Sequence, residues 1–489
     1  MKLFGLFPLA AMILVAVVVA PLSAAGDGLS AARETALLAV DQAADELKTV
    51  NQSIWQWAEI GLQETRSAGL LAETLAKAGF QVQFRVAGMP TAFVASYGSG
   101  KPIVGLLAEY DALPGMSQAV APERKPLEDG AAGHACGHSG LGTAALGAAL
   151  AVKEAYDRHQ LTGTLRLYGT PAEETGIGKT YMLLGGAFDD LDVCLHWHPG
   201  RENRSAYAHS KAVVSVKYTF RGVPAHASTS PESGRSALDA VELMNVGVNY
   251  MREHVKEDAR LHYVVTNGGG QPNVVPPEAQ VWYYIRADDH KDVEYYFEWV
   301  KEIAKAAAKM TRTKLAEVRV DTDNHELIPN LPLSKRILQH MRAVGAPTFT
   351  EEEKSFARRL QEPLQAAFNT EFPVALEEDL KELGDAPFAI KGSTDVGDVS
   401  WHVPTGGLST VCFVAEAPGH SWQNVATIGS SIGEKGILAA AKVLALTALD
   451  CLEDPALVAE AKVDFRKRME DRTYKTLIPE GQKAPASIR

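Results

Sequence analysis

Long apolar runs in the chain predict strands whose two faces are both buried. Three such runs cover residues 102–108, 191–197 and 408–414, a further strand is expected over 163–169, and a helical pattern occupies 140–156. Continuously apolar strands that alternate with helices need cover on both faces. The pattern therefore predicts an α/β fold whose sheet lies between layers of helices.

The chain before these strands predicts two helices and two further strands. Residues 29–80 have apolar positions at helical spacing, and the first helix is expected over about 30–59. Residues 80–87 and 91–98 alternate between apolar and polar side chains, which is typical of strands.

The hydrophobic pattern changes between residues 212 and 318. Here about four strictly alternating strands are interleaved with two amphipathic helices, at 233–255 and 292–310. Alternation is typical of a sheet with one open face. This region therefore predicts a smaller α+β domain inserted into a larger one.

The insertion divides the catalytic-type domain into two parts of the chain. The first part is expected over 29–211 and the second over 319–489. Within the second part, an acidic segment over about 348–385 predicts a helical insertion, which a capping box from Thr350 to Glu353 opens.

The N-terminus has the pattern of an export signal. Lys2 precedes an apolar run over 3–22, and the small residues Ser23 and Ala25 follow. This arrangement predicts a signal peptide over 1–25 and an exported, periplasmic protein without stable membrane insertion. A retained membrane anchor is the alternative, since the run is nearly long enough to span a bilayer.

Charge and cysteine content narrow the functional classes. The 489-residue chain has a formal net charge of −12, which argues against nucleic acid or an anionic membrane as a partner. Its four cysteines are too few for a disulfide scaffold. Cys194 and Cys412 lie in apolar strands and Cys451 ends an apolar helix, so only Cys136 has titratable neighbours.

Polar residues collect where the predicted strands end. The pairs are Glu109 with Asp111, Glu173 with Glu174, and His196 with His198. Ligands of open α/β sheets bind at the carboxyl ends of strands, so we expect these side chains to lie close together.

The stretch "GHACGH" at 133–138 adds a thiol and an imidazole to this set. Cys136 and His138 lie two apart on a glycine-rich turn, and both can face one metal ion. A reactive Cys136 activated by His134 or His138 is an alternative, although the many carboxylates oppose a free thiolate. In another alternative, the glutamates only cap the helix that follows.

The order of motifs "EYDALP", "GHACGH", "PAEETG", "HWHPG", "GVPAHAS", "NVVP" and "GHSW" resembles the aminoacylase/carboxypeptidase family of dinuclear metallo-amidohydrolases. The likeness covers almost the whole mature chain and is with the branch that has a Cys-x-His motif. Residues 224–255 and 392–405 are most similar to the branch that hydrolyses p-aminobenzoyl-glutamate. The resemblance implies a zinc-exopeptidase-like catalytic domain with a mixed sheet, interrupted by a lid and dimerisation domain.

The resemblance also implies roles for residues of the larger domain. Glu173 matches the base that takes a proton from water, and Asp111 matches an acid that orients a ligand. Glu109 replaces a metal-binding histidine of other branches, and its role stays open, as does that of His134. The family spacing selects His198 over His196, which is then a packing residue or supports a ligand. The implied metal ligands are Cys136, His138, Glu174, His198 and His420.

Three further residues are implied in the smaller domain. His226 matches a histidine that reaches the partner subunit's active site and stabilises the oxyanion. Asn273 and Arg286 match residues that hold the substrate, and a guanidinium suits a carboxylate. Pairing of Arg286 with an acid across the sheet is the structural alternative. A homodimer is expected, and a heteromer with a related subunit is the alternative.

The implied reaction is hydrolysis of the amide bond of an N-acyl or N-aroyl amino acid, with p-aminobenzoyl-glutamate as first candidate. Two divalent ions are expected, zinc or manganese, and the ligands also permit cobalt or nickel. Alternatives are an aminoacylase, carboxypeptidase or dipeptidase for another substrate, and a non-catalytic subunit that completes a partner's site. A zinc deaminase would need a C-x-x-C pair, which the chain lacks.

Overall fold

The computed structural model describes residue 1 and residues 30–487. The predicted signal peptide at 1–25 lies outside these residues, apart from Met1. Within the part that is described, no helix is both long enough and apolar enough to cross a membrane.

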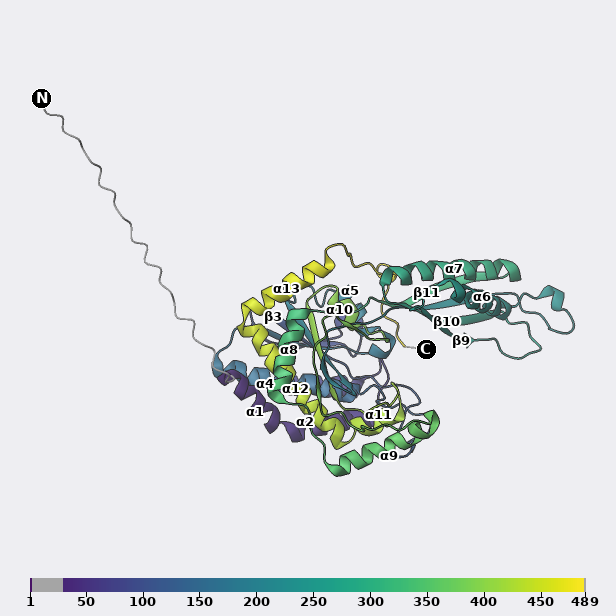
Figure 1. The fold of residues 1–489 in the computed structure, drawn as a ribbon. Helices are drawn as coiled ribbons and strands as arrows, with labels where there is room; N and C mark the ends of the chain where they lie inside the picture. Colours follow the sequence, from purple (N-terminus) through teal and green to yellow (C-terminus); the bar gives the residue numbers. More distant parts are fainter. Residues whose placement is uncertain (2–29, 488–489) are drawn as a thin grey trace.

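A mixed eight-stranded sheet forms the centre of the larger domain (Figure 1). Strands β4, β3, β5 and β14 are parallel to one another, and antiparallel or short strands complete the two edges. In the ladder, Ala108 pairs with Gly169 and His198 pairs with Ser409, so the carboxyl ends of the parallel strands lie along one edge. In sheet order the strands are β1 (Gln81–Phe84), β2 (Phe93–Ser99), β4 (Gly163–Gly169), β3 (Ile103–Ala108), β5 (Val193–Gly200), β14 (Thr405–Val411), β6 (Asn203–Ser205) and β12 (Leu380–Lys381).

One face of this sheet is covered by a layer of helices. Helices α4 and α12 pack against each other and the sheet, and α1, α2 and α8 pack beside them. The buried side of α4 consists mostly of glycine and alanine, which lets its neighbours approach closely. The helices of the larger domain are α1 (Ala31–Gln42), α2 (Ala44–Trp57), α3 (Thr65–Lys77), α4 (His138–His159), α5 (Gly178–Leu184), α8 (Leu331–Val344), α9 (Glu351–Phe368), α10 (Val396–Ser400), α11 (Trp422–Ile428), α12 (Ser431–Glu453) and α13 (Pro455–Met469).

A second hydrophobic core connects the other face of the sheet with a smaller antiparallel sheet. Leu107 and Cys194 belong to this core on the central sheet, and Tyr218 and Tyr283 belong to it on the smaller one. Two helices cover one face of the smaller sheet, and this unit extends to one side of the molecule (Figure 1). Its elements are β11 (Lys314–Asn324), β8 (Ala212–Arg221), β10 (Glu278–Ala287) and β9 (Arg260–Asn267), in sheet order, with α6 (Ala237–Met251) and α7 (His290–Thr311). A two-stranded pair, β7 (Ala208–His209) and β13 (Phe388–Ala389), completes the strands.

The predicted fold class, a mixed α/β sheet interrupted by a smaller α+β unit, is confirmed. The domain boundaries stay a prediction, and β11 continues beyond the expected end at 318. The helix expected over 30–59 is broken at Ala43. Asp45 and Glu46 lie in the first turn of α2, where acidic side chains favour a new helix N-terminus.

The acidic segment at 348–385 is only half helical. The predicted capping box is present, because Glu353 N–H donates to Thr350 Oγ1 and Thr350 N–H donates to Glu353 Oε2. The helix ends at Phe368, since Asn369 adopts a left-handed conformation (φ 49°) that terminates helices. The expectation of a helix up to 385 was therefore too long.

Candidate metal centre

The four parallel strands deliver the predicted polar residues to one edge of the sheet. The side chains that follow or end strands β3, β4, β5 and β14, together with the loop before α4, supply every ligand type of the predicted site. They are Glu109, Asp111, Cys136, His138, Glu173, Glu174, His198 and His420.

The turn before α4 brings Cys136 and His138 into the same group. Gly137 between them has φ 83°, a left-handed conformation that favours glycine. A β-carbon at this position would also approach Phe413 and Pro199 to 2.9 and 3.0 Å. Glycine is therefore required both by the backbone angle and by the space.

Two groups of possible metal ligands share Cys136. The first contains Cys136, His138 and His198, and the second contains Cys136, Glu174 and His420; within each group all ligand atoms lie within 4.8 Å. Cys136 Sγ is 3.4 Å from His198 Nε2, and His420 Nε2 is 3.3 Å from Glu174 Oε2. The structure therefore brings all five predicted ligands together, with the thiol between the two groups.

Hydrogen bonds at Nδ1 leave Nε2 of two histidines facing the other candidate ligands, and for His198 this atom lies next to the Cys136 thiol. His138 Nδ1 lies 2.9 Å from Asp111 Oδ1, and His198 Nδ1 lies 2.7 Å from the Pro199 carbonyl. Each partner is an acceptor, which assigns the proton to Nδ1 in the neutral ring. An acceptor behind a histidine is the usual support of a metal ligand, and Asp111 provides it as predicted for an orienting acid.

Three buried polar atoms at this edge of the sheet have no hydrogen-bond partner among the described residues, as is expected of atoms that bind a metal. Among the described residues, Glu109 Oε2, His138 Nε2 and Glu174 Oε1 are buried and accept or donate no hydrogen bond. Three such atoms on neighbouring side chains are costly unless a ligand satisfies them. Nitrogen, oxygen and sulfur donors of this kind fit a divalent transition metal.

The surroundings of Cys136 do not suit a free nucleophile. Burial and the charge of Glu174 raise the pKa of the Cys136 thiol. Burial also raises the pKa of Glu174 to about 8. Without a cation the thiol stays protonated, so this environment favours a metal ligand over the reactive-thiol alternative.

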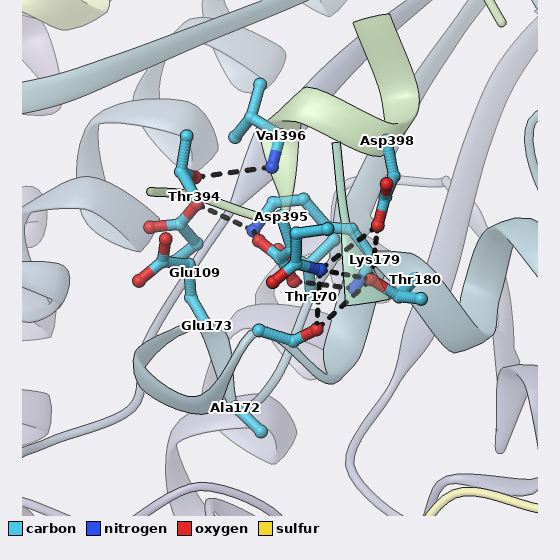
Figure 2. Close-up of polar contacts among 12 residues, drawn as sticks. Glu109, Thr170, Ala172, Glu173, Lys179, Thr180, Thr394, Asp395, Val396 and Asp398 are labelled. Carbon is cyan, nitrogen blue, oxygen red and sulfur yellow. Dashed lines mark hydrogen bonds and ion pairs between the residues drawn. The ribbon is translucent and has the colours of Figure 1, made fainter. Parts of the chain in front are cut away.

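Glu173 lies next to the first ligand group on a strained turn. Ala172 before it has φ 56°, a conformation that costs energy for any residue except glycine and that is common at functional sites. Glu173 Oε2 is 3.9 Å from His138 Nε2. Burial and the charges of Glu109 and Asp395 raise the pKa of Glu173 well above its usual value. Figure 2 shows the Glu173 and Glu109 side chains next to each other.

His134 and His196 have structural surroundings. His134 Nδ1 accepts from Ser139 N–H and its Nε2 lies 3.0 Å from the Ile54 carbonyl, so backbone groups occupy both ring nitrogens. The His196 ring packs against Gly407, where even a β-carbon would come within 2.2 Å. Burial lowers the pKa of both imidazoles to about 4, and neither belongs to a ligand group.

Arg286 on β10 of the smaller domain lies close enough to the site to lower the pKa of His420, after the larger effects of burial and His138. Its Nη1 donates to Ser393 Oγ at 3.2 Å, and its guanidinium lies over the Tyr284 ring at 5.3 Å. Nε is buried without a partner among the described residues, and Glu173 is close enough to affect the pKa of Arg286. The predicted alternative, an ion pair with an acid across the sheet, does not occur in the described structure.

His226 and Asn273 lie apart from the ligand groups on exposed loops of the smaller domain. The two loops are joined, because Ala227 N–H donates to the Asn273 carbonyl. His226 Nδ1 accepts from the backbone N–H groups of Ser228 and Thr229. Its remaining nitrogen, Nε2, therefore carries the proton and faces outward as a donor.

The sequence reasoning missed two charged residues at this edge. Lys179 on α5 and Asp395 before α10 are fully buried and paired with each other, and Lys179 also contacts Glu109. Lys179 lies only five residues after Glu174, and a lysine within an otherwise apolar stretch (177–184) was the available signal.

Comparisons with known proteins agree with this geometry. A model of peptidase family M20/M25/M40 matches residues 105–450. A p-aminobenzoyl-glutamate hydrolase subunit from Escherichia coli (strain K12) is 40% identical over 452 residues, which cover 88% of this chain and 94% of that protein. Xaa-Arg dipeptidase from Mus musculus is 29% identical over 464 residues, or 91% and 96% of the two chains.

A solved structure shows the same fold. The aminobenzoyl-glutamate utilization protein from Klebsiella pneumoniae matches with a TM-score of 0.58 at 20% identity, over 84% of this chain and 97% of that one. The predicted resemblance and the predicted enzyme class are thus confirmed. The chain belongs to peptidase family M20/M25/M40, a family of amide-bond hydrolases.

Proposed function

We propose that the chain hydrolyses the amide bond of N-acyl or N-aroyl amino acids, with p-aminobenzoyl-glutamate as the first substrate to test. The observation that carries this proposal is the pair of ligand groups that share Cys136, with Glu173 beside them. The name of the 40% identical relative supports the choice of substrate.

Each residue of the centre has a distinct task in this reaction. Two divalent ions, when bound, polarise the scissile carbonyl and make water more acidic. Glu173 takes the proton of the attacking water and passes it to the leaving amine. Asp111 holds His138 through Nδ1, which keeps the ring in one orientation. The thiolate, imidazole and carboxylate donors suit zinc, and they also permit manganese, cobalt or nickel.

The proposal is tested with the purified chain alone. We expect glutamate release from p-aminobenzoyl-glutamate that a chelator abolishes and added zinc or manganese restores. An N-aroyl glycine and an Xaa-Arg dipeptide are the comparison substrates, since the dipeptidase relative makes the dipeptide an alternative. A protein that binds both ions but hydrolyses none of these compounds would contradict the proposal and support the non-catalytic alternative.

Arg286 is proposed to bind the carboxylate of the amino-acid half. Its guanidinium, with the unpartnered Nε, can make a bidentate contact with a carboxylate. Hydrogen bonds to charged groups contribute about 1.5–3 kcal/mol, so Arg286→Met should raise KM roughly 10- to 150-fold. Arg260→Met is the matched control, because Arg260 pairs with Arg286 across the ladder but donates only to backbone carbonyls. An unchanged KM in Arg286→Met would contradict this role.

The chain is further proposed to act as a dimer through the smaller domain. Large apolar side chains are exposed on α6 and on the edge strand β9, namely Leu243, Val246, Tyr250, Val264 and Val265. An apolar patch beside an open sheet edge is typical of an interface. A second copy of this chain is the proposed partner. The 40% identical relative is by name one subunit of a hydrolase, which makes a related second protein the alternative.

In such a dimer, His226 would stabilise the oxyanion in the partner's site. His226→Ala is expected to lower kcat by about 10²- to 10³-fold. Because each site then needs Glu173 from one copy and His226 from the other, refolding Glu173→Gln and His226→Ala proteins together should restore about a quarter of wild-type activity, as statistical mixing of a two-fold dimer requires. No gain on mixing would show that His226 does not act between copies.

We infer export from the N-terminal pattern of Lys2, the apolar run and Ala25. The intact mass of protein recovered from the periplasm should correspond to a chain that starts at Gly26. Recovery of the chain with its N-terminus intact in the membrane fraction would support the retained anchor instead.

A further inference from the structure

Three charged side chains form a buried ion triplet beside the candidate metal centre. Lys179 Nζ lies 2.7 Å from Glu109 Oε1 and 2.5 Å from Asp395 Oδ1. Asp395 Oδ2 also accepts from the Lys179 backbone N–H at 2.9 Å. The side chains come from three separate segments, α5, the end of β3 and the start of α10, and Figure 2 shows them meeting around Lys179.

The triplet carries more negative than positive charge. Two carboxylates share one ammonium, and the three side chains are 0 to 4% exposed. Buried charges are stable only when they are paired. When both carboxylates are ionised, the second negative charge needs a positive partner that is not among the side chains of the triplet.

Glu109 directs its free oxygen away from Lys179 and toward the metal centre. Its Oε2 has no hydrogen-bond partner among the described residues and lies 3.3 Å from His138 Nε2, which also has none. Asp111 holds the other ring nitrogen of His138, so Nε2 is the ring atom that faces this oxygen. A buried carboxylate oxygen and an imidazole nitrogen at this distance can share one cation, either a proton or a metal ion.

Glu109, His138 and Glu173 thus form a third set of ligand atoms within 4.8 Å of one another, and His138 joins it to the Cys136 groups. We propose that Glu109 is a further carboxylate ligand of the ion bound by His138, and that Lys179, anchored by Asp395, is a positioning residue that fixes Glu109 for this task. The inference rests on the proposed two-metal site. It adds that the metal ion is the positive partner of the Glu109 carboxylate.

Zinc binding in the absence of substrate tests the role of Glu109. Chelator competition on wild-type protein should give two zinc ions for each chain. Glu109→Gln keeps the shape of the side chain but removes its charge. It should lower the affinity for one of these ions by at least about tenfold. The other ion should be retained. Two unchanged zinc affinities in this variant would overturn the proposal.

The matched control removes a buried carboxylate elsewhere. Asp450 is 1% exposed and pairs with Arg33, Arg336 and His340, none of which belongs to a ligand group. Asp450→Asn should lower the unfolding temperature and leave both zinc affinities unchanged. If Asp450→Asn also loses zinc, the effect of Glu109→Gln is due to general destabilisation, and this result would contradict the proposal.

Lys179 is tested by its effect on the same ion. Lys179→Met should lower the affinity for the same zinc ion that Glu109→Gln affects. The double variant should bind zinc about as Glu109→Gln does, since both changes remove the same interaction. Lys179→Arg keeps the charge and should restore part of the affinity. Lys179→Arg also replaces Lys179→Met in the test of zinc affinity if the methionine variant does not fold. A lower unfolding temperature of the metal-free protein with unchanged zinc affinities would show that Lys179 is only structural.

The outcomes separate this inference from the proposed function. A protein that binds two zinc ions, with one of them dependent on Glu109, but hydrolyses no amide contradicts the function alone. A hydrolase whose zinc affinities do not depend on Glu109 contradicts the inference alone. A wild-type protein that binds no zinc contradicts both.

Discussion

Replacing Glu173 by glutamine is expected to lower kcat for p-aminobenzoyl-glutamate by about 10²- to 10⁴-fold, the range typical of a positioned general base. Glutamine has the same shape but cannot take a proton from water. Glu173 lies 3.9 Å from His138 Nε2 and belongs to the third set of ligand atoms with Glu109, but to neither of the two groups that share Cys136. The variant should therefore keep both metal ions while losing the chemical step.

Initial rates and metal content measured on the same sample distinguish these effects. Glu298→Gln is the matched control, because Glu298 is exposed on α7 and, among the described residues, forms its ion pair with Lys301; its kcat should equal that of the wild type. If Glu173→Gln retains most of the wild-type kcat, Glu173 is not the base. If the Glu173→Gln protein loses its metal ions, the main role of Glu173 is to bind them.

Replacing Cys136 by serine is expected to remove both metal ions and, with them, the activity. Cys136 is the residue that the two ligand groups share, so one substitution affects both sites. A neutral hydroxyl is a much weaker ligand than a thiolate for zinc. The affinity for both ions should fall by more than about 100-fold, since even changes behind the ligands cost 10- to 100-fold.

Metal content after dialysis, measured by elemental analysis, checks this prediction. Cys194→Ser is the control, because Cys194 is a fully buried cysteine on β5, the strand of His198, but belongs to no ligand group. The control should keep two ions for each chain even if its unfolding temperature falls. A Cys136→Ser protein that still binds two ions would show that the thiol does not bridge the two groups.

The hydrophobic pattern was enough to predict where the site lies. Because the strand before Glu109 is continuously apolar and those that lead to Glu173 and His198 are rich in apolar residues, a buried sheet could be inferred, and parallel strands place their carboxyl ends along one edge. His420 could not be placed by pattern alone, because it follows β14 and lies 284 residues after Cys136. The motif order of the family supplied it.

Other features depend on contacts that local pattern does not encode. The ion triplet joins Lys179 to Asp395 across 216 residues, and nothing near either residue indicates its partner. The break at Ala43 was missed because the apolar spacing continues through it and only the acidic residues that follow mark a new helix start. His134 was left open, since only the fold shows that Ile54 and Ser139 occupy its two ring nitrogens.

The most direct test of the account is reconstitution of the metal-free enzyme. Protein stripped by a chelator is titrated with zinc or manganese while glutamate release from p-aminobenzoyl-glutamate is measured. The two ligand groups around Cys136 predict no activity at the start and a maximum at two ions for each chain. Full activity in the metal-free protein, or a maximum at one ion, would contradict a two-metal centre bridged by Cys136.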